Sequence, residues 1–453
     1  RSYTGCQYSH FRETMTDNIM QTIAVIALGC PKNTVEAEYL FGIFQEKGFK
    51  ISSNLDEADI VVIHTCSFIK AAKAESEKCI RTILDIKKKK SLRVYVSGCL
   101  PQLLKEKMSV LFPDIDGFAG TGTLQYLPDL VFGKNFSRFI LPPGGLNDSN
   151  YRVLSSSIPS AYLKIAEGCG HACSFCIIPA LRGRYESRTM ESLVDEATAL
   201  AESGIKELIL IAQDTTGYGQ DIYDAFVLDK LLVKLSKING LKWIRLLYAH
   251  PLSITDGLIE VFKEHKKICS YIDIPIQHAS KNVLSAMKRP LNTPDIIEKI
   301  KRKLPDIVLR TSIIMGFPGE TKKDVNELIN FLNRGYFQYA GVFEYSDLKE
   351  AVSSKLKGHV RAAAAKERRI MIENAQYDIF KSKIDKIKNN TVEFLVESCL
   401  KKGTAYSIKG RSSFQSPEID GNIILTNDKP LVVGEFCKAK VRSVYGYSIK
   451  VYI

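Results

Sequence analysis

Residues 162–176 read YLKIAEGCGHACSFC, and this stretch decides the central fold of the chain. A short strand-like run leads directly into a loop that holds three thiols, at Cys169, Cys173 and Cys176. A structural zinc ion is normally closed by four ligands, whereas three thiolates on a [4Fe–4S] cluster leave one iron open. His171 is the local candidate for a fourth ligand, but its position between the first two cysteines suits a shared zinc ion poorly. The loop therefore predicts an iron–sulfur cluster with one iron free to bind a small ligand.

Strand-like runs continue along the chain from this loop and alternate with helical patterns. The runs cover residues 162–167, 206–212, 243–248, 271–276, 308–314 and 340–345, and helical patterns include 190–203, 254–265 and 321–334. Six such βα units predict an open or partial (β/α) barrel, in which chemistry is found at the C-terminal ends of the strands. Polar or glycine-rich residues follow several of these ends: Gln213 and Asp214, Gln277 and His278, and the segment GFPGE at 316–320.

Three further cysteines occupy equivalent positions in the N-terminal part of the chain. Strand-like runs at 22–29, 59–65 and 92–98 are followed directly by Cys30, Cys66 and Cys99. Helical patterns separate the runs, so this part is predicted to be an open parallel α/β sheet. Because parallel strands end at one edge of a sheet, the three thiols are expected to converge. The alternative is that all three are buried structural cysteines.

The rest of the chain predicts boundaries and a third domain. Residues 141–150 and 155–160 are rich in Pro, Gly, Ser and Asn, as linkers are, and a charged helical pattern covers about 360–388. Short alternating runs with Gly and Asn turns then predict a small C-terminal all-β barrel. The predicted parts are an arm at 1–21, an N-terminal domain at 22–145, a central domain at 155–388 and a C-terminal domain at 389–453.

Composition limits the classes of protein that the chain can represent. The chain has 453 residues, 45% hydrophobic residues and 11 cysteines, and its formal net charge is +13. With no leader-like segment and no apolar run of about 18 residues, the sequence predicts a cytoplasmic protein with reduced thiols and no membrane contact. The basic charge favours an anionic partner such as RNA, or it reflects a lysine-rich solvated surface.

The three-Cys loop, together with the domain before it and the β domain after it, resembles the radical S-adenosylmethionine methylthiotransferase family from about residue 22 to the end. Six short sequence motifs resemble the branch that acts on ribosomal protein S-twelve. They are LGCPKN at 28–33, EGC-x3-CSFCIIPALRGR at 167–184, LILIAQDTTGYG at 208–219, WIRLLYAHP at 243–251, DIPIQHAS at 273–280 and SPEIDG at 416–421. Thr34 and Gly170 depart from that branch at positions that are not ligands.

The resemblance implies roles for individual residues. It implies that Cys169, Cys173 and Cys176 hold a radical-generating [4Fe–4S] cluster that S-adenosylmethionine chelates, and that Cys30, Cys66 and Cys99 hold an auxiliary [4Fe–4S] cluster. Contacts to S-adenosylmethionine are implied for Phe175, Gln213, Asp214, Gln277, Gly316 and Gly319. No catalytic residue beyond the cluster ligands is implied.

The same resemblance implies a reaction and its partners. A radical derived from S-adenosylmethionine would take hydrogen from the β-carbon of an aspartate in protein S-twelve, free or in the small subunit. Sulfur would come from the auxiliary cluster, and a methyl group from a second S-adenosylmethionine. An electron donor of flavodoxin or ferredoxin type is implied, and the basic C-terminal domain resembles TRAM modules, which leaves contact with ribosomal RNA open.

Two other functions remain open from the residues. One is a tRNA methylthiotransferase that acts on a modified adenosine near the anticodon, and the other is a non-catalytic RNA-binding protein with structural zinc. Three basic side chains also have two interpretations each. Lys32 is a candidate to contact an anionic substrate or sulfur species, and Arg182 and Arg184 are candidates to steer an acidic target or to anchor a cofactor carboxylate; all three could instead be surface residues.

Overall fold

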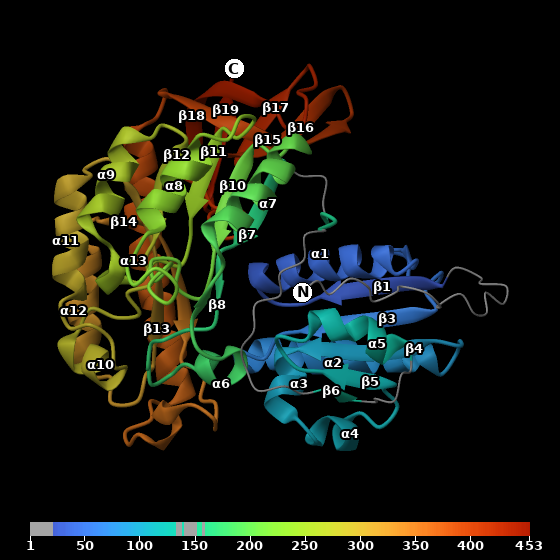
Figure 1. Cartoon of the computed structure of the whole chain (residues 1–453). Helices are drawn as coiled ribbons and strands as arrows, with labels where there is room; N and C mark the ends of the chain where they lie inside the picture. Colours follow the sequence, from blue (N-terminus) through green and yellow to red (C-terminus); the bar gives the residue numbers. More distant parts are fainter. Residues whose placement is uncertain (1–20, 133–137, 140–151, 156–158) are drawn as a thin grey trace, which may run out of the picture.

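The computed structural model describes residues 21–132, 138–139, 152–155 and 159–453. Residues 1–20 of the predicted arm, the whole linker at 141–150 and residues 156–158 of the linker at 155–160 lie outside these residues. Three bodies follow one another along the chain in Figure 1: a blue α/β domain, a green to orange half-barrel, and a red β-barrel at the C-terminus. This arrangement confirms the predicted fold class.

The N-terminal domain is built on a parallel sheet of six strands in the order β2-β1-β3-β4-β5-β6. The strands are β1 (Thr22–Ala27), β2 (Lys50–Ile51), β3 (Ile60–Thr65), β4 (Arg93–Gly98), β5 (Gly117–Ala119) and β6 (Arg138–Phe139). The α-helices are α1 (Pro31–Glu46), α2 (Lys70–Lys87), α3 (Cys99–Leu104), α4 (Lys107–Leu111) and α5 (Leu127–Val131), with a 3-10 turn η1 (Leu124–Tyr126). The sequence predicted only β1, β3 and β4, because strands of two or three residues carry no readable periodicity.

The central domain is a sheet of six parallel strands in the order β14-β13-β12-β11-β10-β7, with β7 and β14 at its two edges. The strands are β7 (Ser160–Lys164), β10 (Glu207–Ile211), β11 (Trp243–Leu246), β12 (Ile268–Asp273), β13 (Val308–Met315) and β14 (Phe337–Glu344). All six predicted strands are present, so the open (β/α) barrel is confirmed. The fourth strand, β12, begins and ends three residues earlier than predicted, since its pairing ends before Pro275, which lacks an amide hydrogen.

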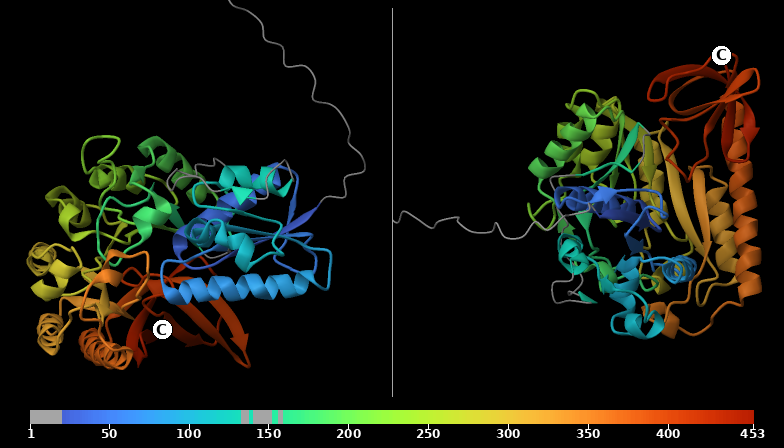
Figure 2. Two further views of the ribbon diagram at one scale, coloured as in Figure 1. Left: turned by 90° about the horizontal axis from the view of Figure 1, so that it is seen from below. Right: turned by 90° about the vertical axis from the view of Figure 1, so that its right-hand side faces the viewer.

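Helices cover the outside of this half-barrel, as Figure 2 shows from two further directions, except for the short α6 (Ile178–Arg182), which lies against α3 of the N-terminal domain. The other helices are α7 (Met190–Glu202), α8 (Leu228–Ser236), α9 (Asp256–Glu264), α10 (Lys281–Ala286), α11 (Thr293–Lys303), α12 (Lys322–Leu332) and α13 (Ala362–Lys386), with the 3-10 turns η2 (Pro251–Ser253) and η3 (Val352–Lys355). A small antiparallel pair, β8 (Ala166–Glu167) and β9 (Glu186–Ser187), closes the base of the cysteine loop. None of the described helices is long and apolar enough to cross a membrane.

The C-terminal domain is a closed barrel in the order β15-β16-β17-β19-β18. Its strands are β15 (Thr391–Lys402), β16 (Ala405–Ser412), β17 (Ile423–Asn427), β18 (Phe436–Tyr445) and β19 (Ser448–Tyr452). Buried ion pairs fix it to the half-barrel: Glu207 of β10 accepts hydrogen bonds from Arg245 of β11 and from Arg411 of β16. Because each buried charge has a partner of opposite charge, these ion pairs hold the C-terminal barrel in direct contact with the half-barrel.

Candidate active site

The three-thiol loop lies directly after β7 and β8, at the C-terminal end of the first strand of the half-barrel. Hydrogen bonds between near neighbours in sequence stabilise the loop. The amide of Cys176 donates to the carbonyl of Cys173 (3.1 Å), and the amide of Ile178 donates to Cys176 Sγ (3.4 Å). Burial raises the pKa of Cys169 to about 11 and that of Cys176 to about 12, and each thiol is influenced by Cys173. Cys169 and Cys176 therefore both lie within electrostatic reach of Cys173.

Arg289 is a member of this site that the sequence analysis missed. Its guanidinium lies 3.9 Å from Cys173 Sγ, donates to the carbonyl of Pro275, and leaves a buried Nε without a hydrogen-bond partner among the described residues. A nearby cation favours the thiolate form that metals require. Arg289 precedes Pro290 and follows a short helix, so no local pattern marks it as part of a site.

The predicted contacts to S-adenosylmethionine lie on the strand ends around this loop. Phe175 packs against Val283, Met287 and Phe317, so it joins the cysteine loop to the GFPGE segment. Gln213 donates to Glu167 (2.6 Å), and its own side-chain oxygen has no described partner. Their contact with S-adenosylmethionine stays a prediction.

Three of the other four predicted contacts, Gln277, Gly316 and Gly319, have an unusual backbone conformation or close backbone packing. Gln277 has a left-handed φ of +67° and pairs with Ile313 of β13, which places it beside the strand that leads to GFPGE. Gly316 packs against Ala365 of α13, while Gly319 has open space where a side chain would be. Non-glycine residues held at positive φ are uncommon and cluster at functional sites.

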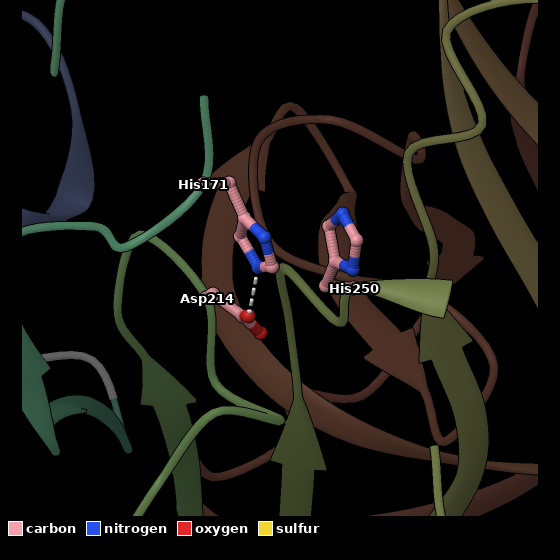
Figure 3. Close-up of side chains that lie close together, drawn as sticks. All are labelled: His171, Asp214 and His250. Atoms are coloured by element: carbon pink, nitrogen blue, oxygen red, sulfur yellow. Dashed lines mark hydrogen bonds and ion pairs between the residues drawn. The ribbon is translucent and has the colours of Figure 1, made fainter. Parts of the chain in front are cut away.

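Asp214 contacts two histidines, which form a small polar group at the ends of β10 and β11 (Figure 3). His171 Nε2 lies 2.7 Å from Asp214 Oδ2, and the rings of His171 and His250 stack at 3.7 Å with 16° between their planes. Their ligand atoms are close enough for a metal ion. However, stacked parallel rings direct their lone pairs along separate planes, so they do not converge on one ion.

His250 is neutral within this group. Its burial, together with Arg289 and His171, lowers its pKa to about 3, and its Nδ1 is buried with no described partner. His278, the other histidine that the sequence singled out, is fully buried; burial lowers its pKa to about 4 and its Nε2 is likewise without a described partner. Both are neutral polar groups at strand ends, and neither is placed to act as a base.

The second set of thiols meets at the edge of the N-terminal sheet. Cys30 is the N-cap residue of α1, Cys66 follows β3 and Cys99 is the first residue of α3. Ser76 fixes the backbone of Cys66, because its hydroxyl donates to the carbonyl (2.7 Å) and accepts from the amide (3.1 Å). Burial raises the pKa of Cys99 to about 12, with Cys66 and Cys30 also acting to raise it. The three thiols therefore lie close enough to influence one another, as the sequence predicts, and their role as ligands stays a prediction.

Glycine precedes a cysteine in both sets for a steric reason. Gly29 has a φ of +93°, and a Cβ there would lie 2.8 Å from Cys66 Sγ. Gly168, before Cys169, has a φ of +72°, and a Cβ there would lie 1.8 Å from the carbonyl oxygen of Arg184. Only glycine combines this backbone with such close approach. The repeated Gly-Cys pair was a readable signal that the sequence analysis did not use.

Four charged side chains join the two parts of the site, and we call them the junction cluster: Glu36, Lys164, Glu167 and Arg182. Lys164 donates to both glutamates at 2.9 Å, and Arg182 donates to Glu36 (2.6 Å) and Glu167 (3.0 Å). All four are buried. The proposed role of Arg182 in steering or anchoring a free ligand is therefore wrong, since its donors are used by the protein, whereas Arg184 is exposed.

The donor sets fit iron–sulfur clusters. Each set offers three thiols that follow strand ends and influence one another, with a cation close by, Arg289 in one case and Arg182 in the other. Thiolates are the ligands that such clusters take, and positive charge nearby helps to balance a negative cluster. The six cysteines remain predicted ligands.

This fold and site define a radical S-adenosylmethionine enzyme. Three family models match the chain: uncharacterized protein family UPF0004 over residues 22–120, the radical SAM superfamily over 163–332, and a TRAM domain over 390–452. The methyltransferase TsrM from Kitasatospora setae, solved with cobalamin and a [4Fe–4S] cluster, has a TM-score of 0.56 at 14% identity over 74% of this chain and 77% of its own. That likeness supports the fold.

Curated relatives give the family. The ribosomal protein uS12 methylthiotransferase RimO of Endomicrobium trichonymphae is 94% identical over 439 residues, which cover 97% of this chain and 100% of the relative. RimO of Thermoanaerobacter sp. (strain X514) is 40% identical, covering 95% of this chain and 99% of the relative. The chain belongs to the RimO family of radical S-adenosylmethionine methylthiotransferases. Membership confirms the predicted enzyme class and the predicted cofactors, S-adenosylmethionine and two [4Fe–4S] clusters.

Proposed function

We propose that the chain methylthiolates the β-carbon of an aspartate in ribosomal protein uS12, which is the S-twelve protein of the sequence analysis. The observation that carries this proposal is the pairing of two three-thiol sets across one junction. The relatives named uS12 methylthiotransferase cover nearly the whole chain, which favours this substrate over tRNA. Their likeness also disfavours a non-catalytic zinc protein.

Cys169, Cys173 and Cys176 would hold the radical-generating cluster, and Cys30, Cys66 and Cys99 the auxiliary cluster. When bound, these groups and S-adenosylmethionine supply the electron, the hydrogen-abstracting radical, the sulfur and the methyl group. An unactivated C–H bond resists acid–base catalysis, which is why the cofactors carry this chemistry.

The protein's own residues bind and orient. Phe175, Gln277, Gly316 and Gly319 line the strand ends where the adenosine part of S-adenosylmethionine would lie. Gln213 and Asp214 offer polar atoms at the next strand end, where Asp214 is already bonded to His171 and Thr216. The junction cluster holds the two thiol sets in a fixed relation, so a single target carbon can meet both.

Partners and boundaries follow from this assignment. We propose uS12, free or in the small subunit, as the protein partner, ribosomal RNA as a contact of the basic C-terminal barrel, and a flavodoxin or ferredoxin as electron donor. A ribosomal substrate places the enzyme in the cytoplasm. The domain limits 22–145, 155–388 and 389–453 are proposed with it, preceded by an arm at 1–21.

A comparison of substrates tests the proposal. The reconstituted enzyme is incubated anaerobically with S-adenosylmethionine, sulfide and reductant, in one tube with uS12 and in another with tRNA. We expect the mass of uS12 to increase by one methylthio group, with no change in tRNA. A mass gain on tRNA alone would reject the proposed substrate.

A further inference from the structure

Two buried lysines at the junction of the first two domains have contrasting surroundings. Lys164 of β7 is bonded to two carboxylates, those of Glu36 and Glu167. Lys32 of α1 is only 9% exposed, yet it has no carboxylate partner among the residues that the structure describes. The surface interpretation of Lys32 is therefore wrong.

The contacts of Lys32 are weak for a buried cation. Its ammonium lies 3.5 Å from the carbonyl oxygen of Ala212 and 4.2 Å from the centre of the Tyr248 ring. A carbonyl and an aromatic face lower the cost of burying an ammonium group but do not neutralise it. Glu36, on the same helix, is already shared by Lys164 and Arg182 in the junction cluster. One positive charge is thus left for an anion from outside the protein.

Lys32 is also placed between the two parts of the site. It is two residues from Cys30, on the first turn of α1, and its ammonium reaches the end of β10 at Ala212, one residue before Gln213. Tyr248, beneath it, follows β11 with a left-handed φ of +59°. Strain of this kind in a bulky residue is typical of functional positions. The backbone amide of Tyr248 donates to the Asp273 carboxylate at 3.3 Å, which fixes the backbone at this position.

We propose that Lys32 binds the side-chain carboxylate of the target aspartate. This inference rests on the proposed function, because it is the reaction that brings an aspartate between the two thiol sets. The carboxyl carbon is bonded directly to the β-carbon, so fixing the carboxylate at Lys32 fixes the reacting carbon within one bond length. Lys32 then determines specificity for aspartate over asparagine and positions the target.

Binding measurements with the reconstituted holoenzyme test this role. The dissociation constants are measured for uS12 with aspartate at the modified position and for uS12 with asparagine there. We expect the wild-type enzyme to prefer aspartate by roughly tenfold, the order of a charge-assisted hydrogen bond. Lys32→Met should lose that preference by weakening binding of the aspartate form alone, and Lys32→Arg should restore part of it. Lys47→Met, an exposed lysine after the same helix, should behave as wild type.

Stability separates this role from a structural one. Lys32→Met removes a buried charge that lacks a partner, so its unfolding temperature should equal or exceed that of the wild type. A lower unfolding temperature of Lys32→Met would overturn the proposed role of Lys32. An unchanged preference of Lys32→Met for aspartate would also overturn it, and would assign the charge of Lys32 to cluster-bound sulfur instead. If the wild-type enzyme modifies uS12 while Lys32→Met keeps its preference, only this inference fails. If the wild type does not modify uS12, the proposed function fails as well.

Discussion

At the scale of single residues, the site depends on backbone that only glycine can adopt. Gly168 turns the chain immediately before Cys169 and lies against the carbonyl of Arg184, and Gly29 makes the same kind of approach to Cys66. The position of each thiol therefore depends on the glycine before the cysteine as well as on the cysteine itself. The sequence makes this visible as Gly-Cys pairs at both sites.

Gly168→Ala tests this dependence. A methyl group would lie 1.8 Å from a backbone oxygen, so the loop must move and the three thiols must separate. We expect about half of the iron to be lost, since one of two four-iron clusters depends on this loop. Iron analysis after anaerobic reconstitution measures the effect.

Gly204→Ala provides the matched control. Gly204 has a φ of +102° but open space around its Cβ position, so the substitution adds left-handed strain of roughly 1–2 kcal/mol without a clash. Its iron content should equal that of the wild type. Equal iron in both variants would show that loop geometry does not control cluster binding.

At the scale of elements, each parallel strand delivers its polar residues to one edge, and the following helix holds that edge in place. Helix α12 shows how this works, because Thr321 and Asp324 form a reciprocal capping box at its start. Asp324 also accepts a hydrogen bond from Ser280, whose amide donates to His278. The helix start thus connects the GFPGE segment to the Gln277–His278 segment.

Thr321→Ala should destabilise the chain by about 1 kcal/mol, because the amide of Asp324 loses its cap. Urea unfolding measures the change in free energy. Lys322→Ala, which alters an exposed residue next to the cap, should have little effect. A loss of stability from Lys322→Ala as large as that from Thr321→Ala would argue against the capping role.

The order of strands, helices and thiols along the chain could be predicted from the sequence. The contacts between distant segments could not. The phase of Cys30, Cys66 and Cys99 relative to their strands was enough to predict that they meet, because parallel strands share an edge. By contrast, Arg289 joins the site through a contact between distant segments, and its neighbours in sequence carry no pattern. Lys32 stands beside Cys30 in the sequence, but its burial against Ala212 and Tyr248 could not be predicted. Arg182 was misjudged for the same reason, since its burial depends on α1 of another domain.

At the scale of the whole molecule, buried charges dock the three domains to one another. The junction cluster joins the first domain to the half-barrel, and Glu207 with two arginines joins the half-barrel to the C-terminal barrel. Breaking such pairs is costly because it leaves a buried charge unpaired. The three domains are therefore already fixed relative to one another before the substrate binds.

The docking of the C-terminal barrel should weaken in acid. Burial alone would raise the pKa of Glu207, but Arg411 and Arg245 lower it from 4.5 to about 2. A lowered folded-state pKa means that this carboxylate stabilises the fold above its ordinary pKa and loses that effect as the pH falls toward 2, a loss of about 3 kcal/mol. Urea unfolding across this pH range should show the decline in the wild type.

Glu207→Gln should unfold more easily at neutral pH and show a shallower decline below pH 5, because the titrating group is gone. The difference in unfolding free energy between the wild type and this variant should therefore shrink as the pH falls. A constant difference across the range would show that Glu207 does not titrate in the docked interface.

The central claim is that the two thiol sets perform separate parts of one reaction, and two variants measured side by side test it most directly. Each is reconstituted with iron and sulfide and assayed with uS12 for 5′-deoxyadenosine and for methylthiolated product. Cys173→Ala should form neither, whereas Cys99→Ala should form 5′-deoxyadenosine but no methylthiolated uS12. Cleavage of S-adenosylmethionine by Cys173→Ala, or methylthiolated product from Cys99→Ala, would contradict the account.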